Sequence, residues 1–162
     1  MSRWQHYTMH RSSESLAFWT RHLSDQSRKV LLILGLGFDP RMCCGLRMLA
    51  GVRPGCIDEC LLLKYTEGPH SPSQEYAALV ENNHRELVSL MDSHGGITEG
   101  NIGILSAAAA QGRPRRASDV IDQKLLDRFT DVVVDISALP RSIYFPILAK
   151  LLTLLDASAD EA

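Results

Sequence analysis

The chain has 162 residues, of which 45% are hydrophobic and 22% are charged, as in a globular protein of one domain. Its formal net charge of −2 gives no electrostatic support for a nucleic-acid coat or a polybasic membrane patch. No apolar run approaches the roughly 18–20 residues of a transmembrane helix, and no signal-peptide stretch opens the chain, so we expect a cytoplasmic protein with reduced cysteines.

Apolar residues recur with the spacing of helices and strands in alternation. The predicted elements are, in chain order, a helix at 11–24, a strand at 29–34, a helix at 40–50, a strand at 57–65, a helix at 73–94, a strand at 101–106, a helix at 118–129, a strand at 131–136 and a helix at 142–155. The run 30–34 is continuously apolar, which is typical of a strand buried on both faces. This alternation predicts an α/β fold, a Rossmann-like doubly wound parallel sheet of about four strands with flanking helices.

The predicted elements divide the chain into three parts. Residues 1–28 form an N-terminal helical segment, residues 29–156 a Rossmann-like ligand-binding domain, and residues 157–162 a polar tail. Doubly wound domains often carry one or two more strands. We therefore expect either a domain of a longer protein or a subunit whose sheet is completed by a partner.

Two turns that follow apolar strands carry most of the functional information. The first is Gly35-Leu36-Gly37-Phe38-Asp39-Pro40-Arg41, and the second is Asp135-Ile136-Ser137-Ala138-Leu139-Pro140-Arg141. In Rossmann strand order the first and fourth strands are neighbours, so both turns would face one crevice at the carboxyl ends of the strands. Two arginines and several backbone N–H groups around that crevice predict a site for an anionic molecule.

In the first turn, Gly35 and Gly37 would let the backbone turn sharply and approach a ligand closely. Asp39 is placed to cap the next helix, whose N-terminus could instead hold a phosphate or carboxylate. Arg41 would lie in the first turn of that helix, where the dipole disfavours a cation. A local conflict of this kind is typical of a functional residue, and we expect Arg41 to contact phosphate.

In the second turn, Ser137 could donate a hydroxyl hydrogen bond, and Arg141 could make a bidentate contact to phosphate. Asp135 could orient Arg141 or accept hydrogen bonds from a ribose. Glu67, just past the second strand, lies where dinucleotide-binding folds place a ribose-binding acid. A purely structural interpretation of the two turns stays open, because Asp39 and Ser137 are also ordinary helix-capping residues. Glu67, considered by itself, favours a surface role over ligand binding.

The paired pattern, a turn after the first strand and a second turn that opens a helix after the fourth strand, resembles CRISPR-associated Rossmann fold (CARF) sensor domains. Those domains have a D-[ST]-x-G-T-K-like turn after the fourth strand and bind their signals usually across a dimer. The matching residues are Asp135-Ile136-Ser137-x-x-Pro140-Arg141, with Leu139-Pro140-Arg141 where the family usually has Gly-Thr-Lys. The resemblance implies a sensor of small oligonucleotide signals in a prokaryotic defence system that controls an effector elsewhere.

The first turn is similar to a different family. The run from Gly35 to Arg41 looks like the G-x-G-x-D-x-R turn of the leucine carboxyl methyltransferase group, in which the arginine meets the carboxylate of S-adenosylmethionine. Against this, the second strand ends in Lys64-Tyr65-Thr66-Glu67 without an acid at the usual place. A nicotinamide-dinucleotide site is less favoured, because Pro40 stands where G-x-G-x-x-G needs its third glycine.

Catalytic and metal-binding patterns are weak. Cys43, Cys44, Cys56 and Cys60 lack the CxxC spacing of a zinc site, so core thiols are the better interpretation. The sequence has no GxSxG elbow, P-loop or HExxH motif and offers no convincing nucleophile or general base.

We therefore expect a sensing or assembly domain for an anionic, nucleotide-type ligand, acting as a homo-oligomer or with an effector subunit. The alternatives are a class I methyltransferase that uses S-adenosylmethionine and a non-catalytic protein-interaction scaffold.

Overall fold

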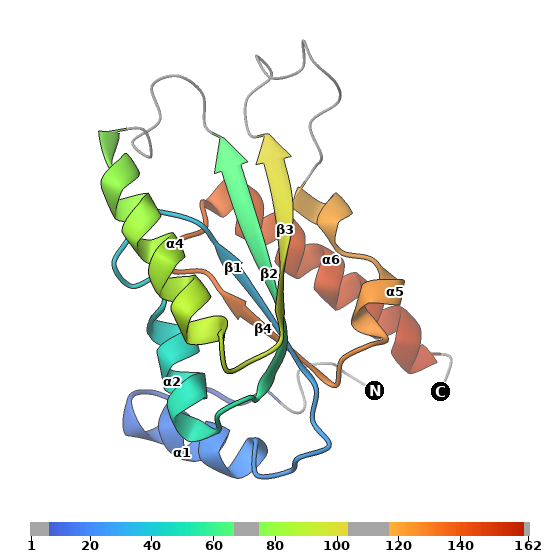
Figure 1. Cartoon of the computed structure of the whole chain (residues 1–162). Coiled ribbons are helices and arrows are strands. Elements are labelled where there is room, and N and C mark those ends of the chain that lie inside the picture. The colour runs from blue at the N-terminus through green and yellow to red at the C-terminus, as the bar shows by residue number, and fades with distance from the viewer. Residues whose placement is uncertain (1–6, 67–74, 104–116, 161–162) are drawn as a thin grey trace.

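Four parallel strands form the centre of the molecule in the computed structural model, which describes residues 7–66, 75–103 and 117–160 (Figure 1). The strands are β1 (Val30–Gly35), β2 (Ile57–Thr66), β3 (Gly96–Gly103) and β4 (Asp131–Asp135). Their order in the sheet is β3-β2-β1-β4, with every neighbouring pair parallel. The prediction of a Rossmann-like α/β fold with the first and fourth strands adjacent is confirmed.

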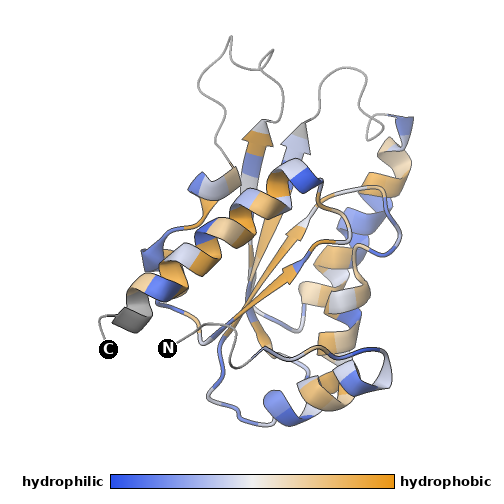
Figure 2. Cartoon of the chain, turned by 180° about the vertical axis from the view of Figure 1, so that it is seen from behind, coloured by the Kyte–Doolittle hydropathy of each residue, from blue (hydrophilic) through white to orange (hydrophobic). Residues whose placement is uncertain are grey.

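Helices cover both faces of this sheet (Figures 1 and 2). One face carries α2 (Cys44–Val52) and α4 (Ala77–Met91), with α1 (Ser13–His22) packed beside α2. The opposite face carries the short 3-10 helix η3 (Ala117–Val120), α5 (Gln123–Leu126) and α6 (Arg141–Asp160). None of the described helices is long and apolar enough to cross a membrane.

The strand β1 is the centre of the core. Val30, Leu32 and Leu34 pack into the cluster with α2 and α4, whereas Leu31 and Ile33 pack into the cluster with α6. All of these side chains are fully buried. Burial of successive residues on opposite faces explains why the run is continuously apolar, and the predicted two-sided burial is confirmed.

Three boundaries differ from the sequence prediction. The helix α2 begins at Cys44 rather than at Pro40, because residues 40–43 form turns, and it continues past Gly51 to Val52. Gly55, with φ of 71°, supplies the left-handed residue in the turn that follows. The final helix extends to Asp160, with Pro146 inside it.

The strand β3 begins at Gly96, five residues before the predicted start at residue 101. Gly95 and Gly96 therefore lie at the entrance to a strand rather than only ending the preceding helix, which stops at Met91. The strand escaped prediction because it lies at a sheet edge, where Thr98 and Glu99 are exposed. The apolar periodicity of a buried strand is then missing.

The predicted helix over 118–129 is wrong. The structure has η3 followed by the single turn α5, and a break separates them at Asp122. The Asp122 carboxylate accepts a hydrogen bond from the Leu125 N–H at 2.8 Å, so it caps a new helix rather than continuing the previous one. A local side-chain hydrogen bond has overridden the apolar pattern.

Candidate functional site

The two turns singled out by the sequence meet at the carboxyl ends of β1 and β4. The parallel pairing of these strands aligns Leu34 with Asp135, so the segments that follow them leave the sheet side by side. Together with Tyr65 of β2 they line a cavity of about 320 Å³. Its lining residues are Gly37, Phe38, Asp39, Tyr65, Ser137, Ala138, Leu139 and Pro140. We call this cavity the crevice.

The glycines of the first turn bring the two turns into direct contact. A Cβ built on Gly35 would lie 2.5 Å from Leu139 Cδ2 and 2.7 Å from the Ala138 carbonyl oxygen. One on Gly37 would lie 3.1 Å from the Tyr65 hydroxyl and 3.2 Å from Ala138 Cβ. The missing side chains therefore make room for the second turn of the same chain. A ligand contact at these glycines stays a prediction.

Asp39 and Arg41 pair with each other. Arg41 donates from Nε to Asp39 Oδ1 at 3.0 Å and from Nη2 to Oδ2 at 2.6 Å, and its backbone N–H donates to Oδ1 at 2.9 Å. These hydrogen bonds lower the pKa of Asp39 to about 2. The expected helix cap is wrong, since α2 begins four residues beyond Pro40, and Arg41 consequently does not lie in the first turn of α2.

Asp135 and Ser137 form a similar local pair in the second turn. The Ser137 N–H and hydroxyl donate to Asp135 Oδ1 at 2.9 and 2.5 Å. The other oxygen of this carboxylate would lie 2.6 Å from a Cβ on Gly45, so Asp135 rests against the first turn of α2. A carboxylate in that position is stabilised by the helix dipole. Within the described residues, no contact joins Asp135 to Arg141.

Arg141 is the first residue of α6 and is exposed beside the crevice. Among the described residues the structure shows no hydrogen bond or ion pair for its guanidinium group, in contrast to that of Arg41. The structure thus brings Gly35, Gly37, Asp39, Arg41, Asp135, Ser137 and Arg141 to the same end of the sheet. Glu67 lies outside the described residues.

Two side chains that the sequence analysis did not select hold the crevice together. The buried Asn83 of α4 donates from Nδ2 to the carbonyl oxygens of Gly37 and Asp39, at 2.8 and 2.9 Å. The Tyr65 hydroxyl donates to the Ala138 carbonyl oxygen at 2.9 Å. Asn83 falls in the inward stripe of α4 with Leu87 and Met91, and a polar residue in an apolar stripe is the signal that could have identified it.

The buried thiols are poor candidates for catalysis. Cys43, Cys56 and Cys60 are buried, as predicted for core thiols, whereas Cys44 is exposed and departs from that prediction. Burial raises the pKa of Cys43 to about 11 and that of Cys60 to about 12. Buried thiols that stay protonated at neutral pH are inert as nucleophiles. Within the described part of the chain, no group of three or more metal-ligating side chains occurs.

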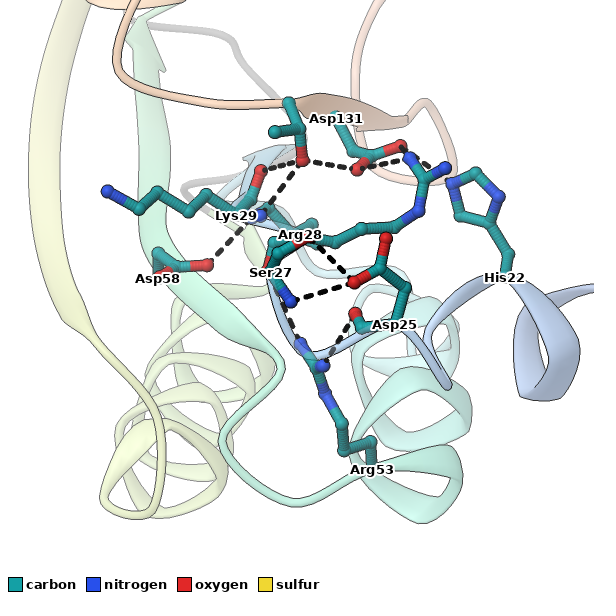
Figure 3. Close-up of polar contacts among 10 residues, drawn as sticks. His22, Asp25, Ser27, Arg28, Lys29, Arg53, Asp58 and Asp131 are labelled. Atoms are coloured by element: carbon teal, nitrogen blue, oxygen red, sulfur yellow. Dashed lines mark hydrogen bonds and ion pairs between the residues drawn. The ribbon is translucent and has the colours of Figure 1, made fainter.

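A second polar cluster lies at the opposite, amino end of the sheet (Figure 3). Asp131, the first residue of β4, accepts hydrogen bonds from His22 Nε2 at 2.7 Å, from Arg28 Nη1 at 3.1 Å and from the Thr130 hydroxyl at 2.6 Å. We call these four residues the amino-end cluster. The hydrogen bonds of this cluster connect β4 to α1 and to the segment that follows α1. Its geometry therefore indicates a structural role.

No protein-family model matches the chain, and no curated protein matches it.

Proposed function

We propose that the crevice binds a small anionic molecule of nucleotide type and that the domain serves in ligand sensing or assembly, the role that the CARF resemblance implies. The observation that carries the proposal is the cavity between the two turns at the carboxyl ends of neighbouring parallel strands. Doubly wound sheets bind ligands at this place. A volume of about 320 Å³ suits a small ligand or one part of a larger one.

The lining of the crevice fits the parts of a nucleotide. Phe38 and Tyr65 present aromatic rings, on which a base can stack. Arg141 supplies an exposed guanidinium group for phosphate, and the Ser137 hydroxyl lies within the lining. Arg41 is already paired with Asp39, so it could contact a phosphate only by giving up that carboxylate. We therefore assign Arg41 a weaker role in ligand binding than Arg141.

Thermal-shift measurements with cyclic oligonucleotides, ATP, NAD and S-adenosylmethionine test the proposal, since a ligand bound to the native state raises the melting temperature. Arg141→Ala should weaken the affinity for the responding nucleotide by about 1.5–3 kcal/mol, the value of a charge-assisted hydrogen bond. Lys150→Ala removes a positive charge further along α6 and is the matched control, for which we expect unchanged affinity.

One observation favours a second function, a protein-interaction scaffold. The carboxylates in both turns are occupied by groups of the same turn, and the glycines face the chain itself. A scaffold needs only such internal contacts. No melting shift with any of the four ligands would support it, a shift with S-adenosylmethionine alone would support the methyltransferase alternative, and a nucleotide shift unaffected by Arg141→Ala would exclude the proposed site.

A further inference from the structure

A second cavity lies on the α2 face of the sheet and shares only Ser137 with the described lining of the crevice. Its volume is about 340 Å³, and residues of α1, α2 and β4 surround it. We call it the edge cavity, because β4 is the last strand on that side of the sheet. The described lining residues that carry the inference are Trp19, Gly45, Met48, Val133, Asp135 and Ser137.

Asp135 belongs to the edge cavity rather than to the crevice. The sequence grouped this residue with the crevice, but in the structure Asp135 is absent from the described lining of the crevice and present in that of the edge cavity. Among the described residues that line the edge cavity, Asp135 is the only charged one, and it is half-buried. Its carboxylate therefore sets the charge that a ligand in the edge cavity would meet.

The two oxygens of this carboxylate have different surroundings. Oδ1 accepts the hydrogen bonds from the Ser137 N–H and hydroxyl. No described residue donates a hydrogen bond to Oδ2, which occupies the space that a side chain at Gly45 would fill, 2.6 Å from a Cβ built there. A carboxylate oxygen at the end of an apolar cavity gains most from a charged donor, because such hydrogen bonds are about twice as strong as neutral ones.

The indole ring of Trp19 reaches the edge cavity from the other direction. His22 Nε2 bonds to Asp131, the first residue of β4, so the end of α1 is attached at the amino end of the sheet (Figure 1). Trp19 lies one turn earlier in α1, and its ring makes edge contacts with the rings of Phe18 and His22, at 5.2 and 5.7 Å between centroids. These contacts hold an aromatic surface in place toward the amino end of the cavity.

We propose that the edge cavity binds a small primary amine with an aromatic body. The ammonium group donates to Asp135 Oδ2, and the body fills the apolar space beside Met48 and Val133 and packs against the ring of Trp19. A cavity of about 340 Å³ is large enough for such a molecule. A neutral ligand would leave the carboxylate unpaired, and an anion would be repelled by it. This inference does not depend on the ligand proposed for the crevice.

Three probes of similar shape and different charge test the proposal on the full chain at pH 7. They are 2-phenylethylamine, which is a cation at this pH, the neutral 2-phenylethanol and the anion phenylacetate. In a Trp4→Phe background Trp19 is the only tryptophan of the chain, so a change in its fluorescence reports occupancy of the edge cavity. We expect the amine to bind at least about tenfold more tightly than the alcohol, and phenylacetate to bind least.

Two variants locate the ammonium group. Asp135→Asn keeps an oxygen that can accept from Ser137 but removes the charge, and it should lower the affinity for the amine at least about tenfold, to that for the alcohol. Gly45→Ala keeps the charge but places a Cβ where Oδ2 lies, so the carboxylate must turn away. Because the displaced atom is the end of a side chain, the fold should persist while the affinity for the amine falls at least about threefold.

The matched control is Gly51→Ala, the same substitution in the same helix. Its Cβ meets nothing within 4 Å, and Gly51 does not belong to the described lining of the edge cavity, so the affinity for the amine should not change. The series of three probes uses a cavity without substitutions and therefore tests the charge preference even where a variant fails to fold.

Four results would overturn the proposal. They are a Trp19 signal that does not respond to the amine, equal affinities for the three probes, an affinity for the amine that survives Asp135→Asn, and equal losses of that affinity in the Gly45 and Gly51 variants.

Discussion

Charged side chains at the two ends of the sheet find their partners at very different distances along the chain. At the amino end, Asp131 is paired with His22 and Arg28, which precede it by more than a hundred residues (Figure 3). At the carboxyl end, Asp39 pairs with Arg41 and Asp135 with Ser137, each two residues away. Long-range pairs tie elements together, whereas short-range pairs only shape a turn.

This difference determines where a substitution should cost stability. The charged residues around the crevice can be replaced with little effect on folding, because the crevice is held instead by Asn83, Tyr65 and the close approach at Gly35. The charges of the amino-end cluster should contribute to folding. The following experiments are arranged from the largest expected effect to the smallest.

Gly95→Ala should have the largest effect on stability and tests how closely the backbone packs at the amino end of the sheet. Its Cβ would lie 1.7 Å from the Asp58 carbonyl oxygen, which is backbone and cannot move aside. We expect a loss of about 3 kcal/mol or more in the free energy of unfolding, measured by urea denaturation. Gly96→Ala is the control, because its Cβ meets nothing within 4 Å, and it should change stability by less than about 0.5 kcal/mol.

Asn83→Ala tests whether a buried amide, rather than the charges, holds the crevice. It removes the donor to the carbonyl oxygens of Gly37 and Asp39, and we expect a loss of about 2 kcal/mol on urea denaturation. Asn82→Ala changes the exposed neighbour and should be almost neutral. Equal effects of the two variants would show that the amide does not anchor the first turn.

Asp131→Asn tests the amino-end cluster. Burial opposes ionisation of Asp131, but hydrogen bonds from Thr130, His22 and Arg28 outweigh it, so its pKa lies below the usual 3.8. A lowered pKa in the folded state adds stability that is present above about pH 4 and is lost as the pH falls through the folded pKa. We expect the variant to lose about 1–2 kcal/mol at pH 7 and progressively less in acid.

The matched control for this variant is Asp127→Asn, which changes an exposed carboxylate paired only four residues away with Gln123. It should be close to neutral in urea denaturation at pH 7. If Asp131→Asn were equally neutral, the long-range pairs of the amino-end cluster would not stabilise the fold.

Asp39→Asn should have the smallest effect and completes the comparison. Its partner Arg41 is 72% exposed, and exposed pairs contribute little to folding. We expect the urea midpoint at pH 7 to fall only slightly, and by less than in Asp131→Asn, because solvent screens the pair that lowers the pKa of Asp39. The pKa of Asp39 near 2 means that the wild-type pair persists down to strongly acidic solution. A clearly lowered midpoint would contradict the expectation that charged residues at the carboxyl end of the sheet contribute less to stability than those at the amino end.

Much of the fold could be predicted because local patterns encode it. The apolar run of β1 indicated burial on both faces, and the alternation of elements indicated a parallel sheet. The polar edge strand β3 and the break at Asp122 were missed, because neither follows an apolar period. The two turns could be located, since each follows a recognisable strand. Asn83 and Tyr65 could not be linked to these turns, because they lie far from them in the sequence and meet them only in the folded chain.

The sequence by itself determined the order of the strands along the chain, the buried character of β1 and the presence of an Asp and an Arg in each turn. Only the tertiary structure decided which groups those residues contact. Hydrophobic periodicity depends on local geometry and can be read from neighbouring residues. The partners of Asp131 and the neighbour that fills the space beside Gly35 depend on how distant strands align, and this alignment exists only once the sheet has formed.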